Sequence, residues 1–378
     1  MTTHSQSIYE ESTLKLWDEH LEQSPKKILL LAQALLSLAS VLLTASVAQA
    51  VLINSGDGTG NTSAPQNDPG FGHVAIVNGL SAVYLQNGWL LTAYHVGSEP
   101  IELGGVTYEL VPNSRTRILS TSSNPPDLAL IKIVGDPGLS PLDLADSTPP
   151  LNSEVTLIGR GRSRGSATSY SGLDGWSWAF PFTIRWGTNR ISDASTFVLD
   201  TQAFSMEFDP PTSSDYTTHE ASATIGDSGG AVFFEKPTGW TLAGIMFSIN
   251  QTAGQPPQTT VYSNRTFAVD LATYRSEILS IISTPDCANG LDDDLDGQID
   301  MGSDPGCASA NDTSEQSLLL ECDNGLDDDL DNLIDFPNDP DCTSSTSISE
   351  SVIVPALQGV TQWITIAAIT FAGLRKIA

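Results

Sequence analysis

Short apolar runs separated by turn-forming residues are the feature that most constrains the fold of this 378-residue chain. Runs at 75–77, 82–85, 89–91 and 155–158 are rich in Val, Ile, Leu, Tyr or Trp, and Gly, Pro, Asn and Ser cluster between them. Many short strands with turn residues between them favour an all-β barrel or sandwich. The length allows one or two domains with a well-buried core.

Three of these segments carry residue types that can perform nucleophilic catalysis. His95 ends the run GWLLTAYHV, Asp127 opens PDLALIKI, and Ser228 lies in ATIGDSGGAVF. A serine hydroxyl needs a base to become a good nucleophile, and an imidazole titrates near neutrality. We therefore predict His95 as the base, with Asp127 orienting its ring and stabilising the imidazolium.

The glycines around Ser228 predict a tight turn that exposes its Oγ. The same turn would direct the backbone N–H groups of Gly226 and Ser228 at a developing oxyanion, where each donor typically contributes about 2.7–4 kcal/mol. Other carboxylates that could take the place of Asp127 lie in loop-like sequence and are less favoured: Asp136, Asp143 and Asp146.

Over roughly residues 72–274 these motifs resemble the trypsin-like, or chymotrypsin-fold, serine proteases. TAYHV stands where the family has TAAHC, DLALIKI where it has DIALLKL, and GDSGGAVF is nearly unchanged. The resemblance implies a two-lobed antiparallel β-barrel domain at 51–284. It implies hydrolysis of protein or peptide substrates through an acyl-enzyme, with no cofactor for catalysis. A non-catalytic surface binding protein on this fold and an esterase on the same scaffold are the alternatives.

The resemblance also implies a substrate pocket that departs from the family's. Its floor falls at Ser222 and its wall at Phe247 or Ser248. A serine at the floor does not select Arg or Lys, so we expect a neutral or apolar side chain to be preferred. The family's half-cystines are absent from this region, and Val96 stands where one follows the histidine.

Activation in this family uses a freshly cut N-terminus, whose ammonium pairs with the aspartate before the nucleophile. That aspartate is Asp227 here. Cleavage after Ala50 would expose Val51-Leu52-Ile53 at roughly the family's distance before the histidine, so export itself is expected to create the activating end. The alternative is that the Gly-, Asn- and Pro-rich stretch 55–70 forms a loose arm.

Residues 287–307 and 322–342 form a tandem acidic repeat with the frame C-x-N-G-L-D-D-D-L-D-x-x-I-D, ending D-P-x-C. Alternating oxygen ligands around a turn residue follow the logic of calcium loops. The repeats resemble the DxDxDG repeats of extracellular proteins, and a structural Ca²⁺ in each would stiffen a stalk at 285–345. A solvated acidic spacer is the alternative. The predicted ligands are Asp292, Asp294, Asp296, Asp300, Asp327, Asp329, Asp331 and Asp335.

All four cysteines lie in these repeats. An even number in an exported chain predicts one disulfide per repeat, Cys287–Cys307 and Cys322–Cys342, each worth about 3 kcal/mol. Zinc is the alternative, but its ligands usually come as close CxxC pairs, which the sequence lacks. The formal net charge of −29, concentrated in the repeats, excludes nucleic acid as a partner.

Both ends carry targeting-type segments. Residues 1–50 have a basic pair, an apolar run and a final Ala-Gln-Ala, which predict a signal peptide removed by signal peptidase; an uncleaved anchor is the alternative. Residues 350–378 contain an uncharged apolar run followed by Arg375-Lys376, long enough to cross a bilayer. This run resembles bacterial sorting tails cut by a dedicated sorting peptidase, although a soluble buried helix would also fit. We expect an exported protein, held at a bacterial envelope or surface by this membrane tail or released.

Overall fold

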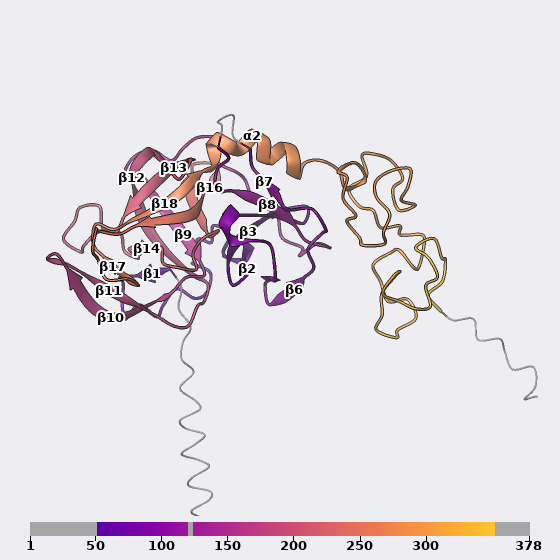
Figure 1. Cartoon of the computed structure of the whole chain (residues 1–378), viewed down its shortest axis with the longest axis horizontal. Helices are drawn as coiled ribbons and strands as arrows, with labels where there is room; N and C mark the ends of the chain where they lie inside the picture. The colour runs from indigo at the N-terminus through magenta and orange to yellow at the C-terminus, as the bar shows by residue number, and fades with distance from the viewer. Residues whose placement is uncertain (1–50, 120–123, 352–378) are drawn as a thin grey trace, which may run out of the picture. The chain divides into compact units, whose positions relative to one another are not determined.

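The computed structural model describes residues 51–119 and 124–351, whose regular structure is almost entirely β (Figure 1). Within these residues there is one α-helix, α2 (Leu271–Ile282). The prediction of an all-β fold is confirmed. The strands are β1 (Leu52–Ile53), β2 (Val74–Val77), β3 (Leu80–Gln86), β4 (Trp89–Thr92), β5 (Ile101–Leu103), β6 (Val106–Tyr108), β7 (Thr116–Arg117), β8 (Ala129–Lys132), β9 (Glu154–Gly159), β10 (Ser163–Tyr170), β11 (Leu173–Ala179), β12 (Arg185–Val198), β13 (Thr201–Glu207), β14 (Ala221–Ser222), β15 (Ala231–Lys236), β16 (Gly239–Asn250), β17 (Thr259–Val261) and β18 (Arg265–Asp270).

The first lobe is a seven-stranded antiparallel sheet in the order β6-β5-β2-β3-β4-β8-β7. Two-residue turns join three of its hairpins, at Asn78-Gly79, Asn87-Gly88 and Gly104-Gly105, and all six of these residues have positive φ. Such turns match the right-handed twist of the strands they join. Every residue of β4 and β8 is buried, so this strand pair forms a rigid centre for the lobe.

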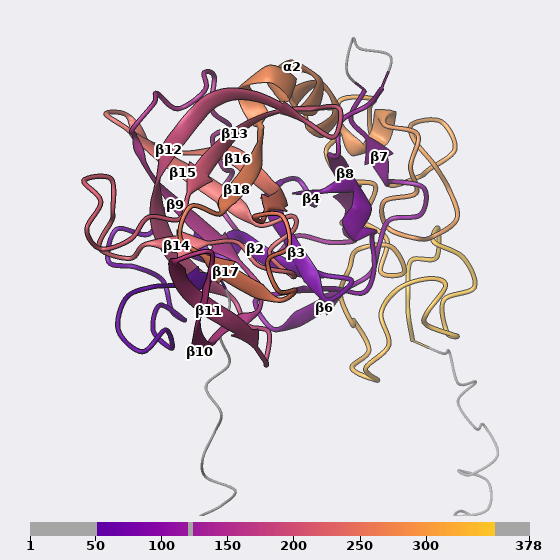
Figure 2. The same cartoon turned by 60° about the vertical axis from the view of Figure 1, so that its left-hand side comes forward.

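The second lobe is a closed barrel in the order β12-β13-β18-β16-β15-β9, which Figure 2 shows from a second direction. Its interior contains Leu157, Phe204, Val232 and Met246, each at most 1% exposed. Because neighbouring strands pair with one another all round, this lobe has no free sheet edge.

Smaller elements complete the fold. β1 pairs with β14, and β10, β11 and β17 form a three-stranded sheet. Helix α2 follows directly after β18, with the Asp270 side chain accepting a hydrogen bond from the Ala272 N–H at its start. Its buried residues recur every three or four positions, which places one apolar stripe against the core. They are Leu271, Tyr274, Ile278 and Ile282.

The described residues after the 3-10 turn η3 (Asp286–Ala288) form neither strand nor α-helix. Instead, the two disulfides Cys287–Cys307 and Cys322–Cys342 close the repeats with the predicted pairing. The apolar runs predicted as signal peptide and membrane tail lie outside the described residues. Within the described ranges, no helix is long and apolar enough to span a membrane.

Candidate active site

His95 and Asp127 meet because the strands beside them are paired. β4 and β8 run antiparallel with Thr92 opposite Ala129, so the end of β4 adjoins the start of β8. His95 lies in the short 3-10 turn that follows β4, and Asp127 lies just before β8. The His95 Nδ1 is 2.6 Å from Asp127 Oδ2, and the backbone N–H of His95 donates a hydrogen bond to Asp127 Oδ1 at 3.0 Å. These two contacts fix the ring relative to the carboxylate.

The Asp127 carboxylate also sets the proton chemistry of the imidazole. An ionised carboxylate only accepts hydrogen bonds, so Nδ1 carries the hydrogen and Nε2 is the basic atom. The hydrogen bond to Asp127 raises the pKa of His95 above 6.5, burial opposes this, and the carboxylate's charge adds to the increase. Thr201 Oγ1 accepts the Asp127 N–H at 2.9 Å. The ring is 44% exposed, so a substrate can reach Nε2.

Ser228 lies in a turn that requires glycine. Gly229 has a φ of 85°, and a Cβ built on it would lie 1.8 Å from the carbonyl oxygen of Ser81. Ser81 in β3 donates its N–H to Ser228 O at 2.9 Å. Its own carbonyl accepts the Thr92 hydroxyl at 2.7 Å. The serine turn therefore packs against the end of β4, the strand that leads to the histidine.

Two backbone N–H groups of this turn, those of Gly226 and Ser228, are directed away from the hydrogen bonds that the described residues form. Among the described residues, none accepts a hydrogen bond from the N–H of Gly226 or of Ser228. The Gly226 carbonyl, by contrast, accepts the Ser81 hydroxyl at 3.1 Å, which fixes the peptide plane that follows it. Within the same residues no hydrogen bond joins the Ser228 hydroxyl to His95. Catalytic hydrogen bonds commonly tighten only when substrate is bound.

Asp227 is fully buried behind the serine turn. Its Oδ2 accepts hydrogen bonds from the backbone N–H and the hydroxyl of Thr224, at 2.8 and 3.0 Å. Burial raises the pKa of Asp227 to about 7, whereas Thr224 and then the backbone N–H groups of Val51 and Gly161 lower it. Its Oδ1 has no full hydrogen bond among the described residues. The buried Val51 thus adjoins a buried carboxylate, one oxygen of which accepts no hydrogen bond within the described residues.

The segment after Val51 is held in place. Leu52 pairs with Ser222 through β1 and β14. The Arg164 guanidinium donates to the carbonyls of Asn54 and Gly56, each at 2.8 Å. Hydrogen bonds therefore hold residues 51–56 in a defined position against the barrel domain.

A cavity of about 220 Å³ opens beside Ser228, and none of its side chains carries a charge. Two predicted pocket residues, Phe247 and Ser248, line it. The predicted floor residue Ser222 does not: it is buried in β14, and Ala223 and Thr224 line the cavity instead. The full lining is Ala223, Thr224, Ile225, Ser228, Met246, Phe247, Ser248 and Ile249.

The predicted calcium ligands separate into two groups. In each repeat three carboxylates offer oxygens within 4.8 Å of one another: Asp292, Asp294 and Asp296, and Asp327, Asp329 and Asp331. The fourth predicted carboxylate of each repeat accepts hydrogen bonds from backbone N–H groups instead. Asp300 accepts the Gly290 N–H, and Asp335 accepts the N–H groups of Asn324 and Gly325. These two aspartates cap the Asn-Gly turn that opens each repeat.

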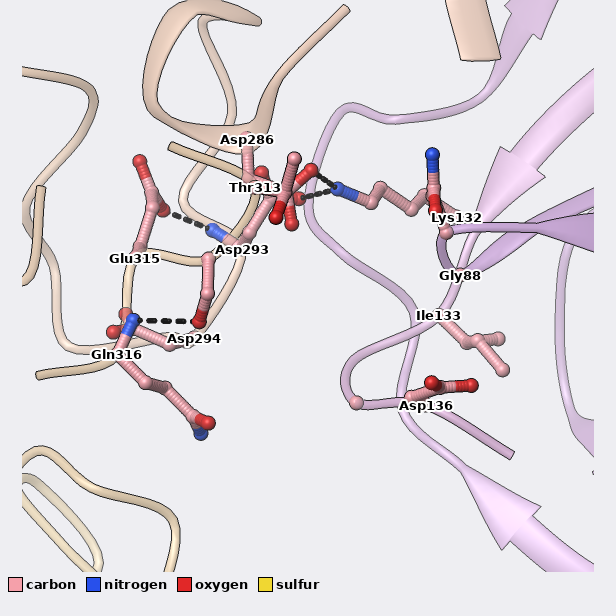
Figure 3. A pocket seen from close by; sticks show the side chains of 13 residues that line it. Gly88, Lys132, Ile133, Asp136, Asp286, Asp293, Asp294, Thr313, Glu315 and Gln316 are labelled. Atoms are coloured by element: carbon pink, nitrogen blue, oxygen red, sulfur yellow. Dashed lines mark hydrogen bonds and ion pairs between the residues drawn. The ribbon is translucent and has the colours of Figure 1, made fainter. Parts of the chain in front are cut away.

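A buried lysine joins the first lobe to the first repeat. Lys132 at the end of β8 is 2% exposed, and its Nζ lies 2.6 Å from Asp286 and 2.8 Å from Asp293 (Figure 3). Burial raises the pKa of Asp286 to about 6, and Lys132 opposes this. The ion pairs border a cavity of about 340 Å³ whose lining includes Asp136 and Glu315.

The fold and this site define a β-barrel domain that presents a histidine–aspartate pair and a glycine-framed serine, the arrangement of a serine hydrolase. Residues 80–245 match the family model of the trypsin-like peptidase domain. This range contains His95, Asp127 and Ser228. This match supports a trypsin-like peptidase domain at residues 80–245 and a function of the serine-protease type. No curated protein matches the chain.

Several buried acidic residues of the repeats escaped the sequence analysis. Glu315 and Glu350 each accept two backbone N–H groups of their own repeat, from Asp293 and Asp300 and from Asp328 and Asp335. Both glutamates lie at the same offset from their repeat's first cysteine. Extending the repeat frame past the second cysteine would have found them.

Proposed function

We propose that this chain is an exported serine endopeptidase that cleaves peptide bonds through an acyl-enzyme at Ser228. The observation that carries the proposal is the His95–Asp127 pair, held at 2.6 Å beside a serine turn that packs on the same strand. The family match points to the same chemistry.

In the proposed reaction, Ser228 Oγ attacks the carbonyl carbon of the scissile bond while His95 Nε2 takes the hydroxyl proton. The imidazolium, stabilised by Asp127, then gives this proton to the leaving amine as the C–N bond breaks. A water deprotonated by His95 hydrolyses the ester and restores the serine. The N–H groups of Gly226 and Ser228, which no described residue accepts, are suited to hold the oxyanion, and each such donor would contribute about 2.7–4 kcal/mol.

The uncharged cavity beside Ser228 favours substrates with a neutral or apolar side chain before the scissile bond. Ile225, Phe247 and Ile249 offer apolar surface there, and no lining carboxylate is present to neutralise Arg or Lys. Transfer of a cationic side chain into such a site without a partner is costly.

We propose further that removal of residues 1–50 activates the enzyme. A new ammonium on Val51 would lie next to Asp227, whose Oδ1 lacks a full hydrogen bond within the described ranges. The ion pair would stabilise the serine turn that Asp227 supports. Protein carrying extra residues before Val51 is expected to be much less active than protein beginning at Val51; equal activity would remove this part of the proposal.

The location of the protein is proposed from its two ends. A signal peptide at 1–50 and a membrane or sorting tail at 350–378 would place the protease at the cell envelope until the tail is cut. The two repeats between them, each closed by a disulfide, would form a stalk stiffened by Ca²⁺. Mass spectrometry of the two ends of the mature protein tests both processing steps.

Turnover of unstructured protein substrates tests the proposed activity. We expect mature protein to hydrolyse a denatured protein and internally quenched peptides, and the Ser228→Ala variant to be inactive at equal folded concentration. Short esters serve as a comparison, because an esterase would hydrolyse them while leaving the peptides intact. Binding of protein ligands without turnover would instead support a non-catalytic surface protein.

A further inference from the structure

The junction between the two repeats, residues 308–321, presents an apolar segment to solvent. Leu318 and Leu319 are 85% and 90% exposed, which makes them the most exposed large apolar side chains among the described residues. Leu320 follows them, and these three are the large apolar residues of the junction. A single exposed leucine is ordinary on a protein surface. Two adjacent leucines that are almost fully exposed instead offer an uncharged, apolar peptide segment to a partner.

The backbone of this segment is held by one local turn. The Leu320 N–H donates to Ser317 O at 3.1 Å, and the Ser317 N–H donates to Asp323 O at 2.7 Å. No described residue forms a hydrogen bond with the backbone of Leu318 or Leu319. To enter an active site in extended form, the segment has to give up only the hydrogen bonds of this turn. Exposed loop tips of this kind are preferred sites of proteolytic cleavage.

The disulfides make a cut in the junction different from a cut inside a repeat. Cys287–Cys307 and Cys322–Cys342 each close one repeat, and neither spans the junction. A single cut between Cys307 and Cys322 therefore separates the chain into two pieces. A single cut within either disulfide loop leaves the pieces covalently joined.

The first repeat keeps its own contacts after such a cut. Glu315, on the N-terminal side of the exposed leucines, accepts the backbone N–H groups of Asp293 and Asp300 at 2.6 and 2.8 Å. These hydrogen bonds and the disulfide remain with the N-terminal piece. The protease domain therefore leaves with a complete first repeat.

Leucine fits the cavity beside Ser228. That cavity has a volume of about 220 Å³, none of its lining side chains carries a charge, and Phe247 and Ile249 offer apolar surface. An apolar side chain gains free energy by leaving water for such a surface. The exposed leucines of the junction are thus of the chemical type that the cavity favours.

The position of the first repeat favours cleavage by a second molecule. The β4–β8 strand pair carries His95 and Asp127 at one end and Lys132 at the other. The ion pairs of Lys132 hold the first repeat at that second end, and Gln316, two residues before Leu318, lines the cavity beside Lys132 (Figure 3). The junction thus follows an anchor that lies away from its own active site.

We propose that a second copy of this protein cleaves the junction after Leu318 or Leu319. Hydrolysis adds one water across the peptide bond, leaving a carboxylate on one leucine and an ammonium on the next. With the proposed membrane tail at 350–378 in place, the cut releases the protease and first repeat from the envelope. This inference rests on the proposed endopeptidase activity and adds a substrate to it.

Cleavage of an inactive copy tests the proposal. The substrate is protein that begins at Val51, extends to the C-terminus and carries Ser228→Ala; a trace of the same protein with intact Ser228 is the enzyme. We expect two pieces under non-reducing conditions, with the new ends at Leu318–Leu319 or Leu319–Leu320 by mass spectrometry. A trace of the Ser228→Ala protein in place of the enzyme should give none.

Variants of the substrate test the site. Replacing both leucines, Leu318→Lys and Leu319→Lys, should slow cleavage by at least about 10-fold, the low end of what a poorly fitting side chain costs in a specificity pocket. Ile348→Lys is the matched control, because it places the same charge at another exposed apolar residue, 76% exposed. It should leave the rate unchanged.

The active protein alone tests which molecule makes the cut. Its half-time for self-cleavage should fall in inverse proportion to its concentration, and a constant half-time would overturn cleavage by a second copy. An intact substrate in the presence of enzyme that turns over a quenched peptide would overturn the junction as a substrate while leaving the proposed function standing. Turnover of neither would overturn both.

Discussion

Replacing Lys132 by Met should destabilise the protein by about 3–5 kcal/mol, the usual cost of removing one partner from a buried ion pair. The side chain of Lys132 is 3% exposed, and those of its partners Asp286 and Asp293 are 19% and 6% exposed. Methionine keeps much of the volume of the lysine side chain. The loss of stability therefore measures the cost of leaving two buried carboxylates without their cation, and not the cost of a cavity.

Lys236→Met is the matched control, because the partner of Lys236 is Asp146, whose side chain is 70% exposed. A surface pair contributes about 0–1 kcal/mol. Urea unfolding followed by tryptophan fluorescence, in a Ser228→Ala background, measures both losses at fixed Ca²⁺.

The pH dependence of the Lys132→Met loss has a defined sign. Burial raises the pKa of Asp286 to about 6 even though Lys132 lowers it, so removal of the lysine raises it further. When the pKa of a carboxyl is higher in the folded than in the unfolded protein, the free energy of unfolding decreases as the pH rises through the folded-state pKa. The deficit should therefore shrink at acidic pH. A loss no larger than that of Lys236→Met would refute the buried bridge.

Four further predictions concern catalysis. Asp127→Asn should lower kcat by about 10⁴-fold through loss of the correct imidazole tautomer, measured with a quenched peptide, and a loss below tenfold would contradict the assignment. Because the pKa of His95 is raised and its neutral form is the base, kcat/KM should rise with pH with a midpoint above 6.5; a midpoint below that value would contradict the His95–Asp127 bond. Asp227→Asn should abolish activity in protein beginning at Val51 while leaving it folded by circular dichroism, and undiminished turnover would exclude the proposed activation. A peptide library should show cleavage after neutral or apolar residues, and a preference for Arg or Lys would contradict the uncharged cavity.

The parts of the fold that could be predicted from sequence are those fixed by local pattern. Asn-Gly pairs between short apolar runs predict hairpins, and the structure has them at Asn78-Gly79 and Asn87-Gly88. His95 and Asp127 could be paired in advance because each adjoins a strand end, where an antiparallel neighbour brings them together. The glycines around Ser228 similarly predict the turn whose close approach to β3 the structure displays.

What could not be predicted depends on contacts between distant segments. In the sequence, Lys132 is an ordinary polar residue at the end of an apolar strand. Its burial depends on the first repeat, which supplies both of its ion-pair partners. The spacing of Asp300 and Asp335 fits a calcium-binding loop, but their carboxylate oxygens accept hydrogen bonds from backbone N–H groups.

Labelling with a fluorophosphonate probe tests the central claim most directly, because the probe reacts only with an activated serine. Incubation of the mature protein, followed by peptide mapping with mass spectrometry, should locate the adduct on Ser228. The variant His95→Ala, which keeps the serine but lacks the base, should label far more slowly. Absence of an adduct on Ser228 in folded protein beginning at Val51, or equal labelling without His95, would contradict the account.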